Sequence, residues 1–275
     1  MLYFSDLLPE KHSETYGHLS KALQKHEVEF RLLKNTADIW CRDYMPVNDS
    51  FGRLVMFRYE PHYLQAFGAL RTSQAKVLKT LPIHLHHKSD LNLDGGNIVR
   101  HGRNAIVTER IYLENRQLTK EEIWDELRSS LGIEKLIVLP CEPPEKDMTG
   151  HADGLCRFID DATVLVNDLS YNPELRKKVL ETLQNHRLEV VEIRLSKPFY
   201  DRFDWSAYIN FLDYGNVIYL PVYGIEEDAD VIDFFESCFR RHTIEPVPCI
   251  EIVLESGVDG GGALNCISWS DKDAD

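Results

Sequence analysis

A repeat runs along the chain and limits the folds that the chain can adopt. Five segments consist of an extended run, a short polar turn and a second extended run, and their starts lie about 50 to 58 residues apart. The second runs are rich in β-branched residues, as residues 163–166 (TVLV) illustrate. The segments cover residues 45–59, 96–108, 154–168, 208–222 and, less completely, 262–269.

A helical pattern follows each of the first four segments, and a further short strand follows each helix. In the clearest helix, Ile123, Leu127 and Leu131 are spaced four apart and Thr119 is placed to cap the first turn. The predicted helices cover residues 64–78, 117–131, 173–184 and 229–240, and the strands after them cover residues 83–85, 136–139, 190–193 and 249–253. Residues 13–26 and 28–33 supply one more helix–strand pair.

The repeating unit is therefore strand–strand–helix–strand, and it occurs five times. The fifth unit has to be assembled from both chain ends, with residues 2–4 as the closing strand. A period near 50 residues built from such units predicts an α/β fold that closes radially, a five-bladed α/β propeller. We expect residues 1–275 to form a single catalytic domain. An open α/β sheet is the alternative.

Composition restricts the partners and the compartment. The formal net charge is -14, which argues against nucleic acid as a partner, because phosphate binding needs clustered Lys and Arg, and which suits a cationic ligand. The start of the chain lacks the features of a signal peptide, and no apolar stretch approaches the ~20 residues of a membrane span. The six cysteines are scattered without a CxxC pair, as in reduced cytosolic proteins. We expect a cytoplasmic protein with no membrane partner, and a homo-oligomer stays open.

Four stretches interrupt the amphipathic pattern by placing charged or thiol groups beside glycine or aromatic residues. They are residues 40–46 (WCRDYMP), 93–97 (LDGGN), 150–153 (GHAD) and 260–266 (GGGALNC). In a propeller the first strands of the blades line the central channel, so equivalent positions of the repeat converge there. Convergence would gather Cys266, His151 and the carboxylates of Asp43, Asp94 and Asp153.

This combination suits the chemistry of a guanidinium group. Carboxylates bind the planar cation edge-on through paired N–H···O bonds. The carbon resists water, so a thiolate is the nucleophile of choice, and a nearby cation such as the substrate lowers the thiol pKa. A histidine can give a proton to departing ammonia and then take one from water.

Each of these residues also has a simpler interpretation. Alone, Cys266 could be a buried structural cysteine, although three preceding glycines allow unusual backbone dihedrals and close approach of a ligand. His151 could be an ordinary loop histidine, with Asp153 on the same face of an extended strand. Asp43 could form a surface ion pair with Arg42, and Asp94 could be an ordinary acidic residue of a turn.

The same motifs resemble those of the agmatine deiminase and bacterial, Porphyromonas-type peptidylarginine deiminase family, within the guanidine-modifying (pentein) superfamily. The matching stretches are WCRDYMP at 40–46, DGGNI at 94–98, GHAD at 150–153, YINF at 208–211 and GGGALNC at 260–266. They occur in the family's order, and the resemblance implies a five-bladed α/β propeller around a central active-site channel.

The resemblance also implies roles. Cys266 would be the nucleophile, His151 the general acid and base, and Asp94 the residue that orients the histidine. Substrate binding would fall to four residues: Asp43, Asp153, Asn210 and Trp40. The reaction would pass through an S-alkylthiouronium intermediate to a ureido product, without a metal or organic cofactor.

The sequence departs from the family pattern at the nucleophile, because Asn265 stands where agmatine deiminases usually have histidine. The contacts to the far end of the substrate are therefore open. We expect a deiminase of a small cationic guanidine, with agmatine favoured. Alternatives are a peptidyl-arginine deiminase that makes citrulline, an amidinotransferase, a binding-only relative, and a metal-dependent hydrolase using His84, His86 and His87 together with His151 and Asp153.

Overall fold

The computed structural model describes residues 1–195, 208–253 and 262–272, which fall into two compact units. The first unit comprises Met1–Arg42, Ala69–Leu81 and Arg194–Asp275, and the second comprises Asp43–Gly68 and Pro82–Ile193. The prediction of a single catalytic domain stays a prediction. Of the helices in these described ranges, none combines the length and the hydropathy that a membrane crossing requires.

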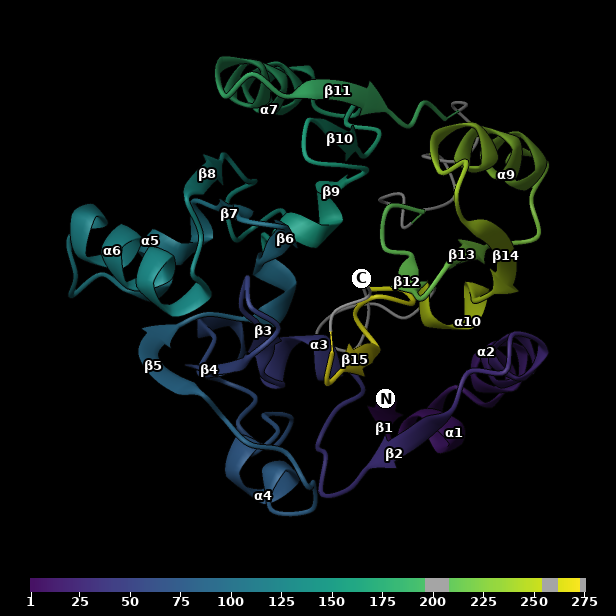
Figure 1. The fold of residues 1–275 in the computed structure, drawn as a ribbon, viewed down its shortest axis with the longest axis horizontal. Coiled ribbons are helices and arrows are strands. Elements are labelled where there is room, and N and C mark those ends of the chain that lie inside the picture. Colours follow the sequence, from purple (N-terminus) through teal and green to yellow (C-terminus); the bar gives the residue numbers. More distant parts are fainter. Residues whose placement is uncertain (196–207, 254–261, 273–275) are drawn as a thin grey trace. The chain divides into compact units, whose positions relative to one another are not determined.

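The described strands form five three-stranded sheets that share one pattern, drawn in Figure 1. In each sheet the central strand pairs antiparallel with one neighbour and parallel with the other, and helical structure connects the parallel pair. This confirms the strand–strand–helix–strand unit and excludes one continuous open sheet within the described strands.

The first unit holds two of these sheets. One has the order β15-β1-β2 and the other the order β12-β13-β14. The elements of this unit are β1 (Leu2–Ser5), α1 (Leu8–Lys11), α2 (Ser13–Lys25), β2 (Phe30–Leu33), α4 (Gln74–Leu78), β12 (Leu212–Tyr214), β13 (Val217–Val222), α9 (Glu227–Cys238), β14 (Thr243–Pro248), α10 (Ile250–Val253) and β15 (Ser268–Ser270).

The sheet β15-β1-β2 joins the two ends of the sequence. β1 pairs antiparallel with β15, with Tyr3 opposite Trp269, and parallel with β2. Both Tyr3 and Trp269 are buried, and their rings stack at a tilt with centroids 5.1 Å apart. The prediction that both chain ends build the fifth unit, with the 2–4 run as its closing strand, is confirmed.

The second unit holds the other three sheets, β3-β4-β5, β6-β7-β8 and β11-β10-β9. Its elements are β3 (Val47–Asn48), β4 (Leu54–Arg58), η1 (His62–Leu64), β5 (His87–Asn92), η2 (Gly95–Asn97), β6 (Val99–His101), β7 (Asn104–Thr108), α5 (Arg110–Glu114), α6 (Lys120–Leu131), β8 (Lys135–Leu139), η3 (Ala152–Gly154), β9 (Cys156–Phe158), β10 (Thr163–Val166), α7 (Pro173–Asn185) and β11 (Glu189–Glu192). The short helix α3 (Cys41–Tyr44) spans the boundary at which the first unit ends and the second begins.

Local sequence explains why α6 forms as predicted. Thr119 and Glu122 form a reciprocal capping box, and Gly132 ends the helix in the left-handed conformation at φ 63°. Ile123 and Leu127 are buried and pack into a core with strands of the neighbouring sheets, where burial of each such side chain contributes about 1.5–3 kcal/mol. In Figure 1, α5 and α6 lie beside β7 and β8.

Three predicted elements are wrong. The helix predicted at 64–78 is reduced to the single turn η1 and to α4. The strand predicted at 83–85 is β5, which begins at His87. The apolar run at 249–253 forms the helical turn α10, and the strand precedes it as β14, whose two prolines are tolerated because β14 is an edge strand. Periodicity cannot separate a short strand from a short helix in runs of this length.

Candidate active site

The polar stretches of the second unit share one local structure. Asp43 lies in α3, and Asp153 lies within η3. Asp94 and His151 directly precede the 3₁₀ helices η2 and η3, without a capping hydrogen bond from either side chain. Each of these single turns immediately precedes the antiparallel outer strand of a sheet. The expectation that His151 and Asp153 share a face of an extended strand is wrong, because η3 replaces the strand at that point.

His151 is held between two carboxylates. Its Nε2 lies 2.9 Å from Oδ2 of Asp94, a hydrogen bond in which the carboxylate accepts. Its Nδ1 lies 3.6 Å from Oδ1 of Asp43, an ion pair when the ring is protonated. His151 is only 8% exposed, so both contacts occur in a desolvated setting where electrostatic interactions are strong. The predicted pairing of Asp94 with His151 is therefore present in the structure.

Two carboxylates and the imidazole of this cluster all lie close to Gly96. Its N–H donates to Oδ1 of Asp43 at 2.9 Å. A Cβ atom on this residue would lie 2.6 Å from Asp43 Oδ1, 2.7 Å from His151 Nδ1 and 3.4 Å from Asp153 Oδ1. Any side chain would force these groups apart, so the second glycine of the DGGN motif is required by the close approach of three functional groups. Asp153 is thereby placed within the same cluster.

Burial and mutual charge shift the proton affinities of this cluster. Burial raises the pKa of Asp43 to about 7, and the charges of Asp94 and Asp153 add to the rise, while His151 opposes it. Burial alone would lower the pKa of His151, but Asp43, Asp94 and Asp153 outweigh it and raise this pKa to about 10. The pair therefore holds an imidazolium at neutral pH, which is the form a general acid needs.

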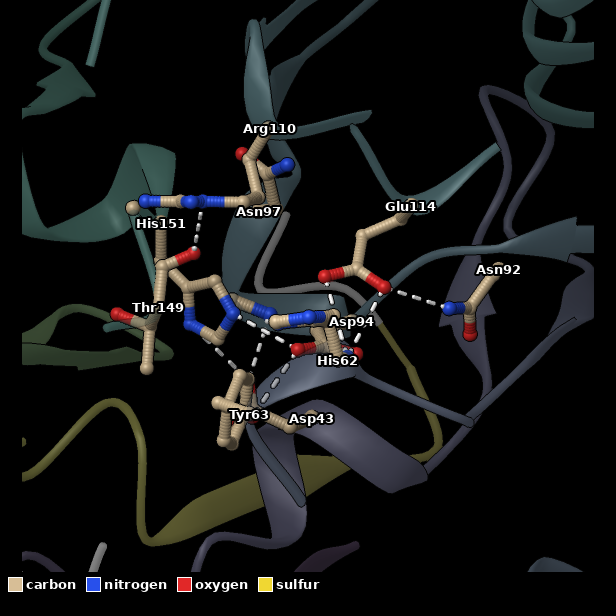
Figure 2. A network of polar contacts seen from close by, with 12 residues as sticks. Asp43, His62, Tyr63, Asn92, Asp94, Asn97, Arg110, Glu114, Thr149 and His151 are labelled. Atoms are coloured by element: carbon tan, nitrogen blue, oxygen red, sulfur yellow. Dashed lines mark hydrogen bonds and ion pairs between the residues drawn. The ribbon is translucent and has the colours of Figure 1, made fainter. Parts of the chain in front are cut away.

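The loop that leads to His151 is fixed by a buried arginine. The guanidinium of Arg110 donates to the carbonyl of Thr149 at 3.1 Å and to the carbonyl of Asp147 at 2.8 Å. It lies against Gly150, whose φ of +60° and lack of a side chain allow the approach. Thr108 Oγ1 donates to the carbonyl of Gly150. Figure 2 shows Arg110 and Thr149 beside His151.

Tyr63 is a further member of this cluster that the sequence did not indicate. Its hydroxyl donates to Oδ2 of Asp94 at 3.0 Å, and its ring meets the imidazole of His151 edge-on, with centroids 6.4 Å apart. It comes from η1, directly before residues 64–78, which periodicity had suggested as a helix. No motif could have singled it out, because a tyrosine beside a helical pattern is normally a packing residue.

The first unit carries Cys266 in a turn formed by residues 264–267, before β15. The side-chain amide of Asn210 donates from Nδ2 to the Cys266 sulfur at 3.1 Å. Its Oδ1 accepts from the backbone N–H groups of Ala263, at 2.9 Å, and of Cys266, at 3.1 Å. Cys266 and Asn210 are 8% and 3% exposed. One amide thus fixes both the turn and the thiol, and the role of Asn210 in substrate binding stays a prediction.

Trp40 is packed against the same turn. A Cβ on Gly262 would clash with the Trp40 ring and lie 2.8 Å from Cys266 Cβ, so this glycine permits the contact. Gly260 and Gly261 of the same motif lie outside the described residues. Next to Trp40, the Cys41 thiol donates to the carbonyl of Ile267 at 2.9 Å, and the backbone N–H of Arg42 donates to the carbonyl of Cys266. The WCRD motif therefore secures the cysteine turn through its backbone and its thiol.

The site residues thus form two groups. The second unit brings together Asp43, Asp94, His151 and Asp153, and the first brings together Trp40, Asn210 and Cys266. Among the residues that the structure describes, no group of three or more His, Cys, Asp or Glu side chains has the arrangement of a metal site. His87, from the alternative metal hypothesis, lies instead beside Glu126 at 3.4 Å.

Comparisons with known proteins identify the family of this chain. The model of the Porphyromonas-type peptidyl-arginine deiminase family matches residues 9–270. A putative agmatine deiminase from Mycoplasma mycoides is 27% identical over 216 residues, which cover 66% of this chain and 58% of that protein. A putative agmatine deiminase from Selenomonas ruminantium is 25% identical, with 95% of this chain and 81% of that protein covered. The chain spans 58 to 59% of the length of three such relatives.

A solved structure establishes the fold class. The agmatine deiminase of C. jejuni superimposes with a TM-score of 0.77 at 21% identity, and the match covers 98% of this chain and 92% of that one. The fold of small three-stranded α/β sheets is therefore shared with that enzyme.

Proposed function

Because the chain belongs to the Porphyromonas-type peptidyl-arginine deiminase family, we propose that it is a guanidine deiminase that hydrolyses a guanidinium to a ureido product and ammonia. The observation that carries the proposal is the buried His151, held between Asp94 at 2.9 Å and Asp43 at 3.6 Å. Packed carboxylates around an imidazolium form a site that gains from a second cation and can donate a proton. Hydrolysis of a C–N bond in a guanidinium uses both properties.

The proposal requires the two groups of site residues to act on one substrate. We propose that the five sheets close into a five-bladed propeller, as the repeat predicts, and that their polar turns line a central channel. The adjacency of one residue from each group in the sequence supports this arrangement. Arg42, whose N–H donates to the Cys266 carbonyl, is followed in the chain by Asp43, whose carboxylate faces His151.

Substrate binding falls to Asp43 and Asp153 in this proposal. Both are buried and both approach Gly96, so their oxygens can accept N–H bonds from the two edges of one planar guanidinium. The pKa of Asp43 is raised to about 7, and a bound cation lowers it again, so substrate binding favours the ionised carboxylate. Trp40 would pack on the apolar stem of the substrate.

The chemistry then proceeds in two halves. The Cys266 thiolate attacks the guanidinium carbon, and the C–N π electrons move onto nitrogen to give a tetrahedral adduct. His151 passes its proton to one amino group, the C–N bond breaks, and ammonia leaves an S-alkylthiouronium. Neutral His151 next takes a proton from water, and the resulting hydroxide adds to the same carbon. The hydroxyl proton of this adduct passes to solvent as the C–S bond breaks, which returns the thiolate, leaves His151 protonated and releases the ureido product.

The favoured substrate is agmatine, which would give N-carbamoylputrescine. Support comes from the curated relatives named as putative agmatine deiminases and from the acidity of this chain, with a net charge of -14, which attracts a small dication. Peptidyl-arginine, which would give citrulline, is the second candidate because the matching family model carries that name. We propose a cytoplasmic single-domain enzyme that acts without a cofactor.

The test is an ammonia-release assay on purified protein with agmatine, free arginine and a short arginine-containing peptide, each with wild type and Cys266→Ser. We expect Cys266-dependent ammonia from agmatine, with a chelator leaving the rate unchanged. Ammonia from the peptide alone would transfer the proposal to peptidyl-arginine. Release that persists in Cys266→Ser would contradict the covalent mechanism, and silence from all three substrates would contradict the proposed substrate class.

A further inference from the structure

Tyr63 and His151 share one oxygen atom. The Tyr63 hydroxyl donates to Oδ2 of Asp94 at 3.0 Å, and His151 Nε2 contacts the same Oδ2 at 2.9 Å. Figure 2 shows Tyr63 and His151 both turned toward the Asp94 carboxylate. Burial and the charge of Asp94 raise the pKa of Tyr63 well above its usual value, so the phenol keeps its proton and acts as a donor.

A separate network fixes the segment that carries Tyr63. The backbone N–H of His62 donates to both carboxylate oxygens of Glu114, at 3.0 and 3.2 Å. Asn92 donates to Glu114 at 2.8 Å, and its Oδ1 accepts from the N–H of Glu60 at 2.8 Å. Figure 2 shows Glu114 between His62 and Asn92. The network joins the end of β5 and the end of α5 to η1, so polar contacts at Glu60 and His62 fix the chain just before the tyrosine.

We propose that Tyr63 is a positioning residue for His151. Its hydroxyl weakens the hydrogen bond between Asp94 and the His151 imidazolium, and its ring packs edge-on against that imidazolium. The catalytic consequence rests on the proposed deiminase function, whereas the effect on His151 itself does not. A second donor to the same carboxylate oxygen stabilises its negative charge, so the oxygen becomes a weaker acceptor for the His151 imidazolium. Without the phenol, Asp94 would act on His151 alone.

This weakening matters because His151 has two opposite tasks in the proposed reaction. It must release a proton to departing ammonia and then accept one from water. Three carboxylates around the ring favour its charged form, so the imidazolium is a weaker acid than an ordinary histidine. The Tyr63 hydroxyl is a neutral group that opposes this bias without adding a charge that would repel a cationic substrate.

The test is the Tyr63→Phe variant, which keeps the ring contact and removes only the hydroxyl. In protein labelled with ¹⁵N-histidine, the NMR titration of His151 should move to higher pH by about one unit, because loss of the Tyr63 donor leaves more negative charge on the Asp94 oxygen that the imidazolium contacts. The His151→Gln spectrum identifies the signal. In the deiminase assay, kcat should fall about three- to tenfold with the KM nearly unchanged, and the pH profile should shift in the same direction.

Tyr112→Phe is the matched control, because it also removes one phenol oxygen from a hydrogen bond, the one accepted from Trp124 Nε1 at 2.8 Å. It should leave the His151 titration unchanged. Glu114→Ala, which releases the anchor of His62, should move the His151 titration in the same direction by a smaller amount. An unmoved titration in folded Tyr63→Phe, or an equal shift in Tyr112→Phe, would overturn the proposal. The titration needs no turnover. If the protein proved not to be a deiminase, the proposed effect of Tyr63 on His151 could therefore still be tested and confirmed.

Discussion

The two groups of site residues are held by different kinds of interaction. In the second unit, His151 is placed by charged partners, Asp94 and Asp43, and its proton affinity is strongly shifted by them. In the first unit, Cys266 is placed by neutral groups, namely the side-chain amide of Asn210 and the backbone N–H of Arg42. One group is organised by electrostatics and the other by hydrogen-bonding geometry.

This difference indicates how a guanidinium substrate could interact with both groups of site residues. In the described contacts, three carboxylates lie around the one imidazolium of His151, and a bound guanidinium would reduce this excess of negative charge. The Asn210 amide fixes the direction of the Cys266 sulfur and can stabilise its charge only modestly, because a neutral amide is a weaker partner than a cation. The guanidinium would then serve both groups at once, as ligand of the carboxylates and as the cation that favours the thiolate.

The largest expected effect tests whether the two groups work as one unit. Cys266→Ser and His151→Gln should each lower the kcat/KM of ammonia release by at least about 10⁴-fold, and the double variant should fall no further, because residues that act in one mechanism are grossly non-additive. Cys238→Ser, on helix α9 of the first unit, is the matched thiol control and should keep full activity. A double variant whose loss equals the product of the single losses would show that the two groups act independently.

The second expected effect concerns substrate binding within the charged group. Asp153→Asn should weaken guanidinium binding and slow the chemical step together, at a cost of about 2–5 kcal/mol, because it removes a desolvated partner of the substrate charge. Asp161→Asn, an exposed residue of the turn between β9 and β10, is the control and should behave as wild type. A loss below about 0.5 kcal/mol for Asp153→Asn would remove it from the substrate-binding residues.

The sequence predicted most of the fold because the strand–strand–helix–strand unit occurs five times, so a weak signal in one unit can be interpreted from the others. Thr119 and Gly132 delimit α6 by capping chemistry that is visible in the sequence. The failures fall where local signals are weak. The helical pattern over 64–78 yields only two short turns, and the run at 249–253 is too short for periodicity to distinguish a strand from a helix.

The candidate site was predictable to the extent that it depends on motifs. The family resemblance of the two motifs implied that Asp94 orients His151, and the structure places their side-chain atoms 2.9 Å apart. Arg110 and Tyr63 could not be predicted, since an arginine that binds carbonyls and a tyrosine that binds a carboxylate leave no local pattern. Their roles depend on contacts between segments about 30 to 40 residues apart, which only the folded chain reveals.

The third expected effect distinguishes the charged group by its response to pH. The folded pKa of His151, about 10, exceeds its unfolded value near 6.5, so its contribution to stability is complete below pH 6.5 and is lost as the pH rises through 10. The free energy of unfolding should therefore fall by about 2–3 kcal/mol between pH 7.5 and 9.5, above the Asp43 pKa of about 7.

Denaturant titration at several pH values measures this slope. The double variant Asp43→Asn, His151→Gln removes both members of the coupled pair and should lose that part of the slope, whereas His101→Gln, an exposed histidine of β6, should retain it. Equal slopes in the wild type and the double variant would mean that His151 is not held as an imidazolium, and the contrast between the two groups would disappear.

The smallest expected effect tests the neutral group. Asn210→Ala removes the N–H donor to the Cys266 sulfur, so the pKa of this thiol should rise by about one unit. The pH dependence of iodoacetamide alkylation, followed by mass spectrometry of the Cys266 peptide, measures the change. Asn216→Ala, in the exposed turn between β12 and β13, is the control.

A second substitution separates the two functions of the amide. Asn210→Asp retains an oxygen that can accept from the N–H groups of Ala263 and Cys266, but it places a negative charge beside the sulfur, so the thiol pKa should rise further than in Asn210→Ala. If both variants alkylate as the wild type does, Asn210 only holds the turn in place and does not stabilise the thiolate. If both shift in the predicted order, a neutral amide and a cationic substrate divide the stabilisation of the nucleophile between them.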